Sequence, residues 1–215
     1  MADVSQPSMN LSTIKLAVLV SGSGTTLQNL IDLSAARKLD AEIPIVIGSR
    51  PNLVGLDRAR AAKLRTEVVD RKTFADCSEF SRQVFGLCDD AGVDLVCLAG
   101  WLCLLDLPQN YAGRVMNIHP ALLPSFGGRG LYGRRVHEAV INHGCKVSGC
   151  TVHFVDGTYD TGPIIVQRCC PVREDDTPET LAHRVFEEEK IAYPEAIRLF
   201  QQGLLKLDGR TVRTG

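Results

Sequence analysis

The stretch MNIHPALLPS, residues 116–125, carries an asparagine and a histidine two residues apart. In a β-strand, such residues project to the same face. Asn117 and His119 would then lie together near the carboxyl end of a strand, where open α/β sheets bind ligands. An amide can donate to a developing oxyanion, and an imidazole can transfer a proton near neutral pH. The alternative is a structural histidine that a backbone group satisfies.

Carboxylates are available in DGTYDTGP, residues 156–163, which connects two later apolar runs. Asp156 and Asp160 can both be turn residues, and Asp156 is the stronger turn candidate because Gly157 follows it. A carboxylate beside His119 would favour the imidazolium form. An amide, an imidazole and a carboxylate together suit acyl transfer at a carbonyl centre. Because no G-x-S-x-G motif is present, direct attack by a substrate nucleophile is favoured over an acyl-enzyme.

A second chemical feature is the glycine-rich stretch SGSGTTLQ, residues 21–28, between an apolar run and a helical pattern. Gly22 and Gly24 allow a tight turn. The free N–H groups of a helix start attract anions, and Ser23, Thr25 and Thr26 add hydroxyl donors. The Walker lysine and the third glycine of the dinucleotide motif are both missing. A small phosphate ester is therefore predicted here, and a capped helix start is the alternative.

These residues need a scaffold, and the hydrophobic pattern predicts an α/β fold. Near-continuous apolar runs indicate buried strands at 14–22, 41–49, 66–70, 93–100 and 113–120. Helical spacing, with threonines as candidate caps of the first helix, indicates helices within 23–39, 55–64 and 78–92. Strands that alternate with helices predict right-handed β-α-β units and a Rossmann-like, mostly parallel sheet flanked by helices.

The second half has a different pattern. Apolar runs at 146–155 and 162–172 are joined by about six residues, too few for a helical crossover. An antiparallel hairpin extension is therefore predicted. A long helix is predicted over 177–203, and its candidate caps and kink are Asp176, Thr177 and Pro194.

Composition limits the classes of function. The chain has 215 residues, of which 45% are hydrophobic and 23% charged, with a net charge of −1. These values predict one α/β domain over 14–215, preceded by a flexible extension at 1–13. A basic footprint for nucleic acid is missing. The sequence also lacks the apolar run of ~20 residues that a membrane helix needs and the pattern of a signal peptide.

The predicted location is therefore the cytoplasm, where the eight cysteines would stay reduced. Their spacing is irregular and contains no C-x-x-C, so no metal site is predicted. Cys97, inside an apolar run, is expected to behave as a small buried apolar residue. The expected partners are small molecules, with no nucleic acid and no membrane, and the chain is expected to be a monomer or a homodimer.

Three motifs in order make the chain similar to a known family: LAVLVSGSGTTLQNLID, NIHPALLPSF and GCTVHFVDGTYDTGPIIVQ. They resemble the phosphoribosylglycinamide formyltransferases of the formyltransferase superfamily, from about Ile14 to Gly203. The resemblance implies transfer of a formyl group from the co-substrate 10-formyltetrahydrofolate to the amine of glycinamide ribonucleotide in purine synthesis, without a metal. Hydrolysis of the same formyl folate, and non-catalytic binding of nucleotides or folates, are the alternatives. The hydrolase and the tRNA formyltransferase of the superfamily normally carry an extra domain, which favours the first function.

The resemblance also implies roles for single residues. Asn117 and a protonated His119 would stabilise the oxyanion, and Asp160 would raise the pKa of His119 and help to relay a proton. The phosphate loop and a glutamate near the same substrate correspond to Gly24, Thr25, Thr26 and Glu189. The folate pocket, contacted largely through the backbone, corresponds to Leu102, Cys103, Leu104 and Leu105, with Asn117. The bond before Pro124 is expected to be cis.

Some positions depart from the family pattern. Cys77 and Cys103 stand where many members have arginines that contact folate. We hypothesise that an arginine of the glycine-rich segment 127–135 supplies part of this missing charge, the candidates being Arg129, Arg134 and Arg135. The alternative is a solvated surface loop.

Other conspicuous side chains have weaker assignments. Trp101 would wall the pterin pocket or simply pack in the core. His153 would orient Asp160 or the substrate, or lie in the core. The remaining histidines are expected at the surface: His137, His143 and His183.

Overall fold

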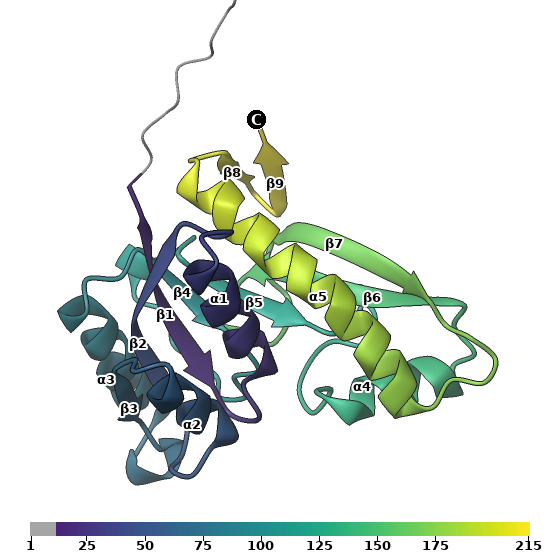
Figure 1. The fold of residues 1–215 in the computed structure, drawn as a ribbon, viewed down its shortest axis with the longest axis horizontal. Coiled ribbons are helices and arrows are strands. Elements are labelled where there is room, and N and C mark those ends of the chain that lie inside the picture. The colour runs from purple at the N-terminus through teal and green to yellow at the C-terminus, as the bar shows by residue number, and fades with distance from the viewer. Residues whose placement is uncertain (1–11) are drawn as a thin grey trace, which may run out of the picture.

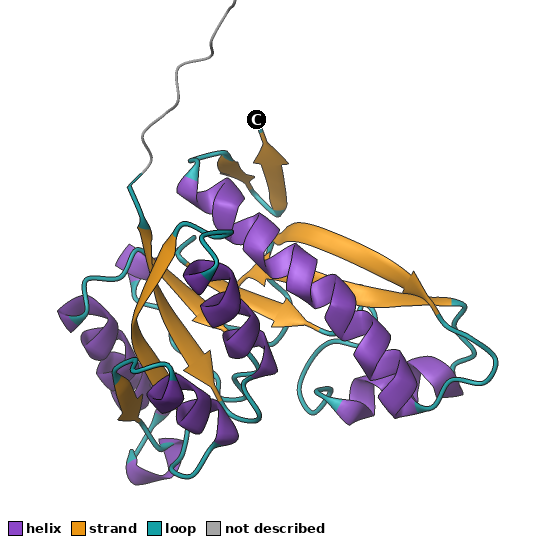
Figure 2. Ribbon diagram, viewed as in Figure 1, coloured by secondary structure: helices purple, strands orange, loops and turns teal. Residues whose placement is uncertain are grey.

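The computed structural model describes residues 12–215 (Figure 1). Nearly all of the predicted flexible extension, residues 1–13, lies outside these described residues. Helices lie on both faces of one sheet that runs through the described chain (Figure 2). The predicted fold class, a Rossmann-like and mostly parallel sheet with an antiparallel extension, is confirmed.

The described sheet has nine strands in the order β3-β2-β1-β4-β5-β6-β7-β9-β8. The strands from β3 to β5 run parallel to one another. They are Ile14–Val20 (β1), Ala41–Gly48 (β2), Thr66–Val68 (β3), Leu95–Leu98 (β4) and Val115–His119 (β5). Each lies inside a predicted apolar run, so the parallel half agrees with the prediction.

Beyond β5 the sheet is mixed: the β5-β6, β6-β7 and β8-β9 pairs are antiparallel, and β7 pairs with β9 in parallel. Val147–Phe154 (β6) pairs with β5 on one side and with Ile164–Pro171 (β7) on the other. This is the predicted hairpin. Two short strands that were not predicted, Leu205–Asp208 (β8) and Thr211–Thr214 (β9), complete the edge. Both are largely exposed, so they lack the apolar run that marks a buried strand.

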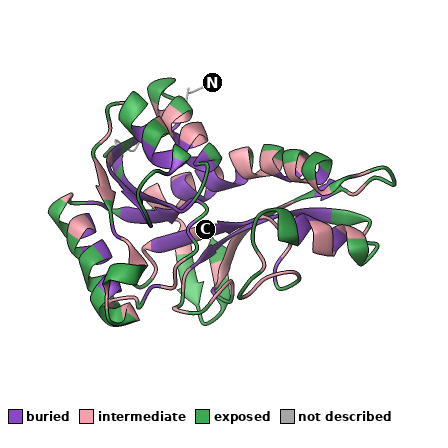
Figure 3. Ribbon diagram, turned by 90° about the horizontal axis from the view of Figure 1, so that it is seen from below, coloured by how far each residue is buried: buried purple, intermediate pink, exposed green. Residues whose placement is uncertain are grey.

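Strand β1 shows why the parallel strands are apolar along their whole length. Leu16 and Val18 belong to the core cluster on one face of the sheet, and Ala17 and Leu19 belong to the cluster on the other. Both faces are covered, so the successive side chains from Leu16 to Val20 are all buried (Figure 3). The same burial raises the pKa of Cys97 in β4 to about 12, which fits its expected role as a small apolar residue.

The helices divide between these two faces. The first cluster contains side chains from Thr25–Ala35 (α1), Val54–Ala61 (α2), Arg134–Asn142 (α4) and Pro178–Gln201 (α5). The second contains side chains from Cys77–Asp90 (α3). Short 3-10 turns occur at Arg71–Thr73 (η1) and Gln109–Tyr111 (η2). Within residues 12–215, every helix is too short or too polar to span a lipid bilayer.

Helix ends correct one prediction and confirm another. Gly24 is the N-cap of α1 and no side chain caps it, so the predicted threonine cap is wrong. Thr177 does cap α5, because its hydroxyl accepts from Thr180 N at 3.3 Å and Thr180 Oγ1 accepts from Thr177 N at 2.9 Å. The helix continues through Pro194, and the kink there stays a prediction.

Candidate active site

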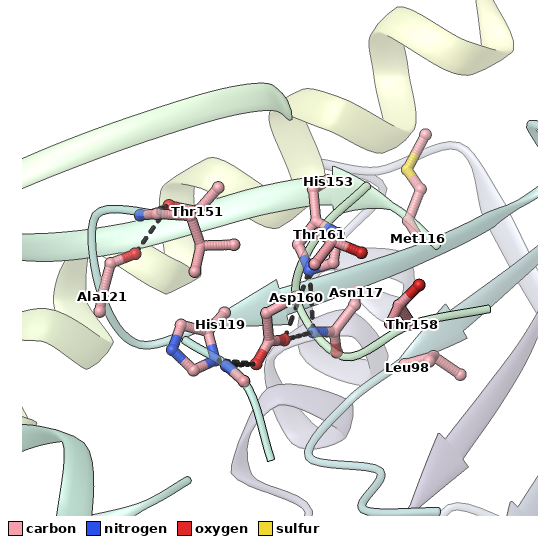
Figure 4. A network of polar contacts seen from close by, with 12 residues as sticks. Leu98, Met116, Asn117, His119, Ala121, Thr151, His153, Thr158, Asp160 and Thr161 are labelled. Atoms are coloured by element: carbon pink, nitrogen blue, oxygen red, sulfur yellow. Dashed lines mark hydrogen bonds and ion pairs between the residues drawn. The ribbon is translucent and has the colours of Figure 1, made fainter. Parts of the chain in front are cut away.

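The pairing of β5 with β6 brings the predicted trio together. Asn117 lies opposite His153 in the antiparallel register, and Asp160 lies in the connection that follows β6. Asn117 Nδ2 donates to Asp160 Oδ1 at 3.2 Å, and His119 Nδ1 lies 3.4 Å from Asp160 Oδ2 (Figure 4). Asp160 has a positive φ of 57°, a conformation that is uncommon for residues other than glycine. The structure therefore places an amide, an imidazole and a carboxylate in mutual contact.

His119 is held between two oxygen atoms. Its Nε2 lies 2.8 Å from the carbonyl oxygen of Phe126, a distance that requires a proton on this nitrogen. Burial lowers the pKa of His119, Asp160 and the Phe126 carbonyl raise it, and the net pKa lies below 6.5. Asp160 thus acts in the expected direction, but burial outweighs it. The direction of this shift favours a neutral imidazole in the resting protein, and the protonated His119 of the transition state stays a prediction.

His153 fixes the orientation of the amide. Its Nδ1 lies 2.8 Å from the Phe154 carbonyl oxygen and so carries the proton. Its Nε2 then accepts a hydrogen bond from Asn117 Nδ2 at 3.1 Å. Both N–H bonds of the Asn117 amide are thus occupied, one by His153 and one by Asp160. Donation to an oxyanion requires one of them to be released.

The turn after His119 is anchored to the hairpin. Thr151 Oγ1 donates to the carbonyl oxygen of Ala121 at 2.7 Å and accepts from Leu123 N at 3.0 Å. The Leu123–Pro124 peptide bond is cis, as expected. Gly128 N donates to Asp160 Oδ2 at 2.9 Å. Burial would raise the pKa of Asp160, but the contacts with the two histidines and with Gly128 N–H lower it below its usual value.

The glycine-rich loop forms the start of α1. Gly24 has a φ of 69°, and a Cβ on it would lie 2.5 Å from Gly55 Cα. Gly55 N donates to Gly22 O at 3.1 Å, and Arg58 Nε donates to Ser23 O at 2.9 Å. Only glycine permits this approach of α1 to α2. The free N–H groups of α1 and the hydroxyl of Thr25 thus lie at the mouth of a cavity.

That cavity has a volume of about 840 Å³. One wall is the glycine-rich loop, a second is the segment 128–135 with the start of α4, and a third is α5. The predicted residues that line it are Gly24, Thr25, Thr26, Leu102, Asn117, His119, Asp160 and Glu189. Burial raises the pKa of Glu189 to about 8, so this carboxyl group is mostly protonated at neutral pH.

A second, narrow cavity of about 50 Å³ lies on the other side of the trio. The predicted folate-pocket residues that line it are Cys103, Leu104 and Leu105. Asn117, Asp160 and Trp101 line both cavities. Figure 4 shows Asn117, Asp160 and His119 side by side at the end of β5. Two members of the trio, Asn117 and Asp160, therefore lie between the two cavities, and His119 faces the large one.

Two features near the site were missed or wrongly predicted from the sequence. Arg134 and Arg135 are the first residues of α4, not part of a loop. His137, expected at the surface, is buried in α4, and burial together with nearby His119 lowers its pKa to about 4. Its spacing from the buried Val140 is the helical signal that could have indicated this. His143 and His183 are exposed as expected.

No group of three or more histidine, cysteine or acidic side chains within residues 12–215 is arranged to hold a metal ion. The two cysteines in place of family arginines lie near the narrow cavity. Cys77 Sγ lies 3.5 Å from the Leu104 carbonyl oxygen, and Cys103 lines the cavity itself.

The fold and this geometry define an α/β protein with a polar trio, of which His119 is buried and Asn117 and Asp160 are half-buried, suited to acyl transfer between two small ligands. Comparison with known proteins gives the family. Residues 14–197 match the formyl transferase family, and the chain belongs to this family. It is 36% identical to the phosphoribosylglycinamide formyltransferase of Haemophilus influenzae, over 90% of this chain and 90% of that protein.

Two further relatives extend the comparison. The glycinamide ribonucleotide transformylase 1 of Symbiobacterium toebii superposes with a TM-score of 0.87 at 41% identity, covering 94% of each chain. The trifunctional purine biosynthetic protein adenosine-3 of Gallus gallus is 38% identical over 94% of this chain. The present chain spans only 20% of that protein's length.

Proposed function

We propose that this protein transfers the formyl group of 10-formyltetrahydrofolate to the amine of glycinamide ribonucleotide. The observation that carries the proposal is the contact of Asn117, His119 and Asp160 in the large cavity, which contains a phosphate-type helix start, while Asn117 and Asp160 also line the narrow cavity. The names of the relatives from Haemophilus influenzae and Symbiobacterium toebii support glycinamide ribonucleotide as the acceptor of a formyl group. In this assignment the ribonucleotide occupies the large cavity, and the reacting part of the folate enters from the narrow one.

The ribonucleotide is held by its two ends. Its phosphate binds the free N–H groups of α1 with Gly24, Thr25 and Thr26, where the helix dipole favours an anion. Glu189, at the α5 wall of the same cavity, is a hydrogen-bond donor when it is protonated. The amine then lies toward His119. Anchoring both ends positions the nucleophile, which lowers the entropic cost of the transfer.

The resting protonation of His119 suits a proton acceptor. When the amine attacks the formyl carbon, the amine must lose a proton, and His119 Nδ1 is the unprotonated ring nitrogen. A proton at Nδ1 is stabilised by Asp160 Oδ2 at 3.4 Å. The same proton is returned to N10 of the departing folate, so that proton transfer balances. His119 and Asp160 therefore act as one acid–base pair.

Asn117 stabilises the negative charge that develops on the formyl oxygen. One of its amide hydrogens stays on His153, which fixes the plane of the amide. The other amide hydrogen exchanges its acceptor, from Asp160 Oδ1 to the oxyanion. This exchange accompanies a turn of Asp160 toward the newly protonated His119. A donor in this position contributes about 2.7–4 kcal/mol of transition-state stabilisation in enzymes of comparable chemistry.

The lining of the narrow cavity suits the reacting part of the folate. The co-substrate supplies an activated formyl carbon on N10. Leu104, Leu105 and Val155 give the narrow cavity an apolar wall, and Asn117 and Asp160 give it a polar end. The proposed location is the cytoplasm, consistent with eight unpaired thiols in the structure.

The test is turnover of purified protein with formyl folate, in the presence and absence of glycinamide ribonucleotide. Release of tetrahydrofolate that requires the ribonucleotide, with formylated ribonucleotide as product, supports the proposal. Equal release without the ribonucleotide identifies a hydrolase. Binding of either ligand without turnover identifies a non-catalytic binding protein.

A further inference from the structure

Two arginines of the segment 128–135 remain without an assigned role. Arg129 and Arg135 line the large cavity opposite the glycine-rich loop, and neither lines the narrow cavity. The segment also contributes Arg134 to the same wall. Within the described chain, no other arginine or lysine side chain lines either cavity. Their position is therefore on the ribonucleotide side of the trio and not on the folate side.

The glycine-rich loop needs a cation from elsewhere. It offers N–H groups and hydroxyls, but it has no lysine or arginine of its own between Ser21 and Gln28. Arg58, which contacts the loop, uses its guanidinium on Ser23 O and Gln28 Oε1. A phosphate dianion bound by N–H groups alone keeps most of its charge uncompensated, which favours additional cationic contacts.

Charge pairing separates the three arginines. Arg134 forms ion pairs at 2.6 Å with both Glu138 and Glu179, so its charge is already matched. Arg129 and Arg135 form no ion pair with any carboxylate in residues 12–215. The two unmatched charges therefore face the cavity.

The remaining acids of the cavity offset these two charges only in part, because Asp160 contributes one negative charge. Asp160 is engaged by Asn117, by Gly128 N and by His119. Glu189 is mostly protonated near neutral pH because burial raises its pKa to about 8. The end of the cavity between the glycine-rich loop and the arginines thus carries a net positive charge.

The segment that carries the arginines is anchored at both ends. Gly128 N is bound to Asp160 Oδ2 at 2.9 Å, and Arg134 ties the start of α4 to Glu179 at the start of α5. Between these points, the guanidinium of Arg135 lies 5.3 Å from the centre of the Tyr132 ring. Stacking of this kind holds a guanidinium in place while leaving its N–H groups free.

We propose that Arg129 and Arg135 bind the phosphate of the ribonucleotide substrate from the side opposite the glycine-rich loop. This inference rests on the proposed function and refines it, since it adds residues to the substrate site and removes them from folate recognition. The segment 127–135 is then a specificity element for a phosphorylated amine. The missing folate-side arginines are not replaced by it.

The test compares Michaelis constants for the two substrates in four variants of the full-length chain. They are Arg129→Ala, Arg135→Ala, the double variant, and the control Arg82→Ala, an exposed arginine of α3 that lines neither cavity. Because one charged hydrogen bond contributes about 1.5–3 kcal/mol, the double variant should raise the KM for the ribonucleotide by about 10-fold or more. Its kcat and its KM for polyglutamylated folate should stay unchanged, as should all constants of the control.

Two outcomes would overturn the inference. A raised KM for polyglutamylated folate with an unchanged ribonucleotide KM would show that the arginines contact the glutamate tail of folate and not the phosphate. Unchanged constants for both substrates would make the segment a solvated loop. Circular dichroism and thermal unfolding of each variant show that any loss is not a loss of fold, and the double lysine variant should recover part of the affinity.

A direct binding measurement separates this inference from the proposed function. Ribose 5-phosphate carries the phosphate without the amine, and its affinity is measured by calorimetry at low and high salt. The wild-type protein should bind it more tightly than the double variant, and the difference should shrink at high salt. If the wild type shows no turnover, the proposed function fails while this comparison still decides the inference. Equal affinities of the two proteins would refute it.

Discussion

The sheet is parallel from β3 to β5 and mixed from β6 to β8, and the two halves contribute different parts of the site. The parallel half has strands buried on both faces, and it supplies the glycine-rich loop and the segment 99–105 from the carboxyl ends of β1 and β4. The antiparallel half supplies Asp160, His153 and the anchored segment 128–135. Asn117 and His119 lie on β5, at the boundary between the halves.

This division explains why neither half alone carries a complete site. The parallel half resembles a general phosphate-binding scaffold, because its loops present backbone N–H groups at strand ends. The chemistry depends on the connection after β6, which returns across the ends of β5 to bring Asp160 to His119. Substitutions should therefore have different consequences on the two sides of β5.

The largest difference is expected between two glycines. A Cβ on Gly162, beside the hairpin, would lie 1.8 Å from the carbonyl oxygen of Phe154, whereas a Cβ on Gly86 in α3 would meet nothing within 4 Å. Gly162→Ala should destabilise the fold by about 3 kcal/mol or more. Gly86→Ala should stabilise it by about 0.5–1 kcal/mol, since alanine favours a helix interior. Urea unfolding of both variants measures the two effects.

The same two glycine variants should also differ in activity. A Cβ on Gly162 would lie 3.4 Å from His153 Nδ1, so this variant should also lose activity if any of it folds. Gly86→Ala should retain full activity. A fully stable and active Gly162→Ala protein would show that the hairpin connection can shift without disturbing the trio.

The next largest effect is a loss of kcat on substitution of His119, on β5 at the boundary between the halves, or of its partner Asp160. His119→Ala and Asp160→Asn should each lower kcat by roughly 10²-fold or more, the usual scale for a positioned acid–base group. The double variant should lose little beyond either single variant, because the two residues act as one pair. Steady-state kinetics of the three proteins provides the measurement, and independent, multiplying losses would separate the residues.

The pH profile distinguishes a charge effect of Asp160 from a purely structural one. Asp160 raises the pKa of His119 against the lowering effect of burial. In Asp160→Asn the pKa of His119 should therefore fall further, and the acidic limb of kcat/KM should move to lower pH. An unchanged acidic limb would mean that His119 is not the group whose titration is observed.

A smaller effect concerns stability in the antiparallel half. Burial raises the pKa of Glu189 from 4.5 to about 8. The folded protein therefore retains a proton that the unfolded chain releases above about pH 4.5, and the stabilising contribution of this group is lost as the pH rises through 8. Relative to Glu189→Gln, the wild type should lose stability between pH 5 and pH 8.5. Parallel pH dependences of unfolding in the two proteins would contradict the raised pKa.

The parallel half was also the more predictable one. Long apolar runs such as that of β1 exist because both sheet faces are covered and residues on both faces are buried. Such a run can be recognised in the sequence as a strand. In the other half, β8 and β9 are exposed and leave no such run, and α4 is preceded by a glycine-rich segment that conceals its start. The pattern was too weak there to place these elements.

Prediction of the site was limited by a different cause. Spacing was sufficient to place Asn117 and His119 on one strand face, since that is a local property. The resting protonation of His119 was not predictable, because it depends on burial and on the Phe126 carbonyl seven residues away. The sequence likewise did not reveal that both amide hydrogens of Asn117 are occupied, because the partner on the opposite strand, His153, is set by the hairpin register.

The smallest predicted effect lies on the folate side, in the parallel half. Arg71 is the cation whose charge lowers the pKa of the Cys103 thiol against the raising effect of burial, and Cys103 lines the narrow cavity. Because a partly exposed charge pair contributes only about 0.2–1 kcal/mol, Arg71→Ala should raise the KM for polyglutamylated folate by about 1.4- to five-fold. The KM values for monoglutamyl folate and for the ribonucleotide should stay the same. Arg71 itself lines neither cavity and acts through its proximity to Cys103. The matched control is Lys72→Ala, a neighbouring exposed cation. Equal changes for both folate forms would show that Arg71 supports the fold of this wall and does not contact the glutamate tail.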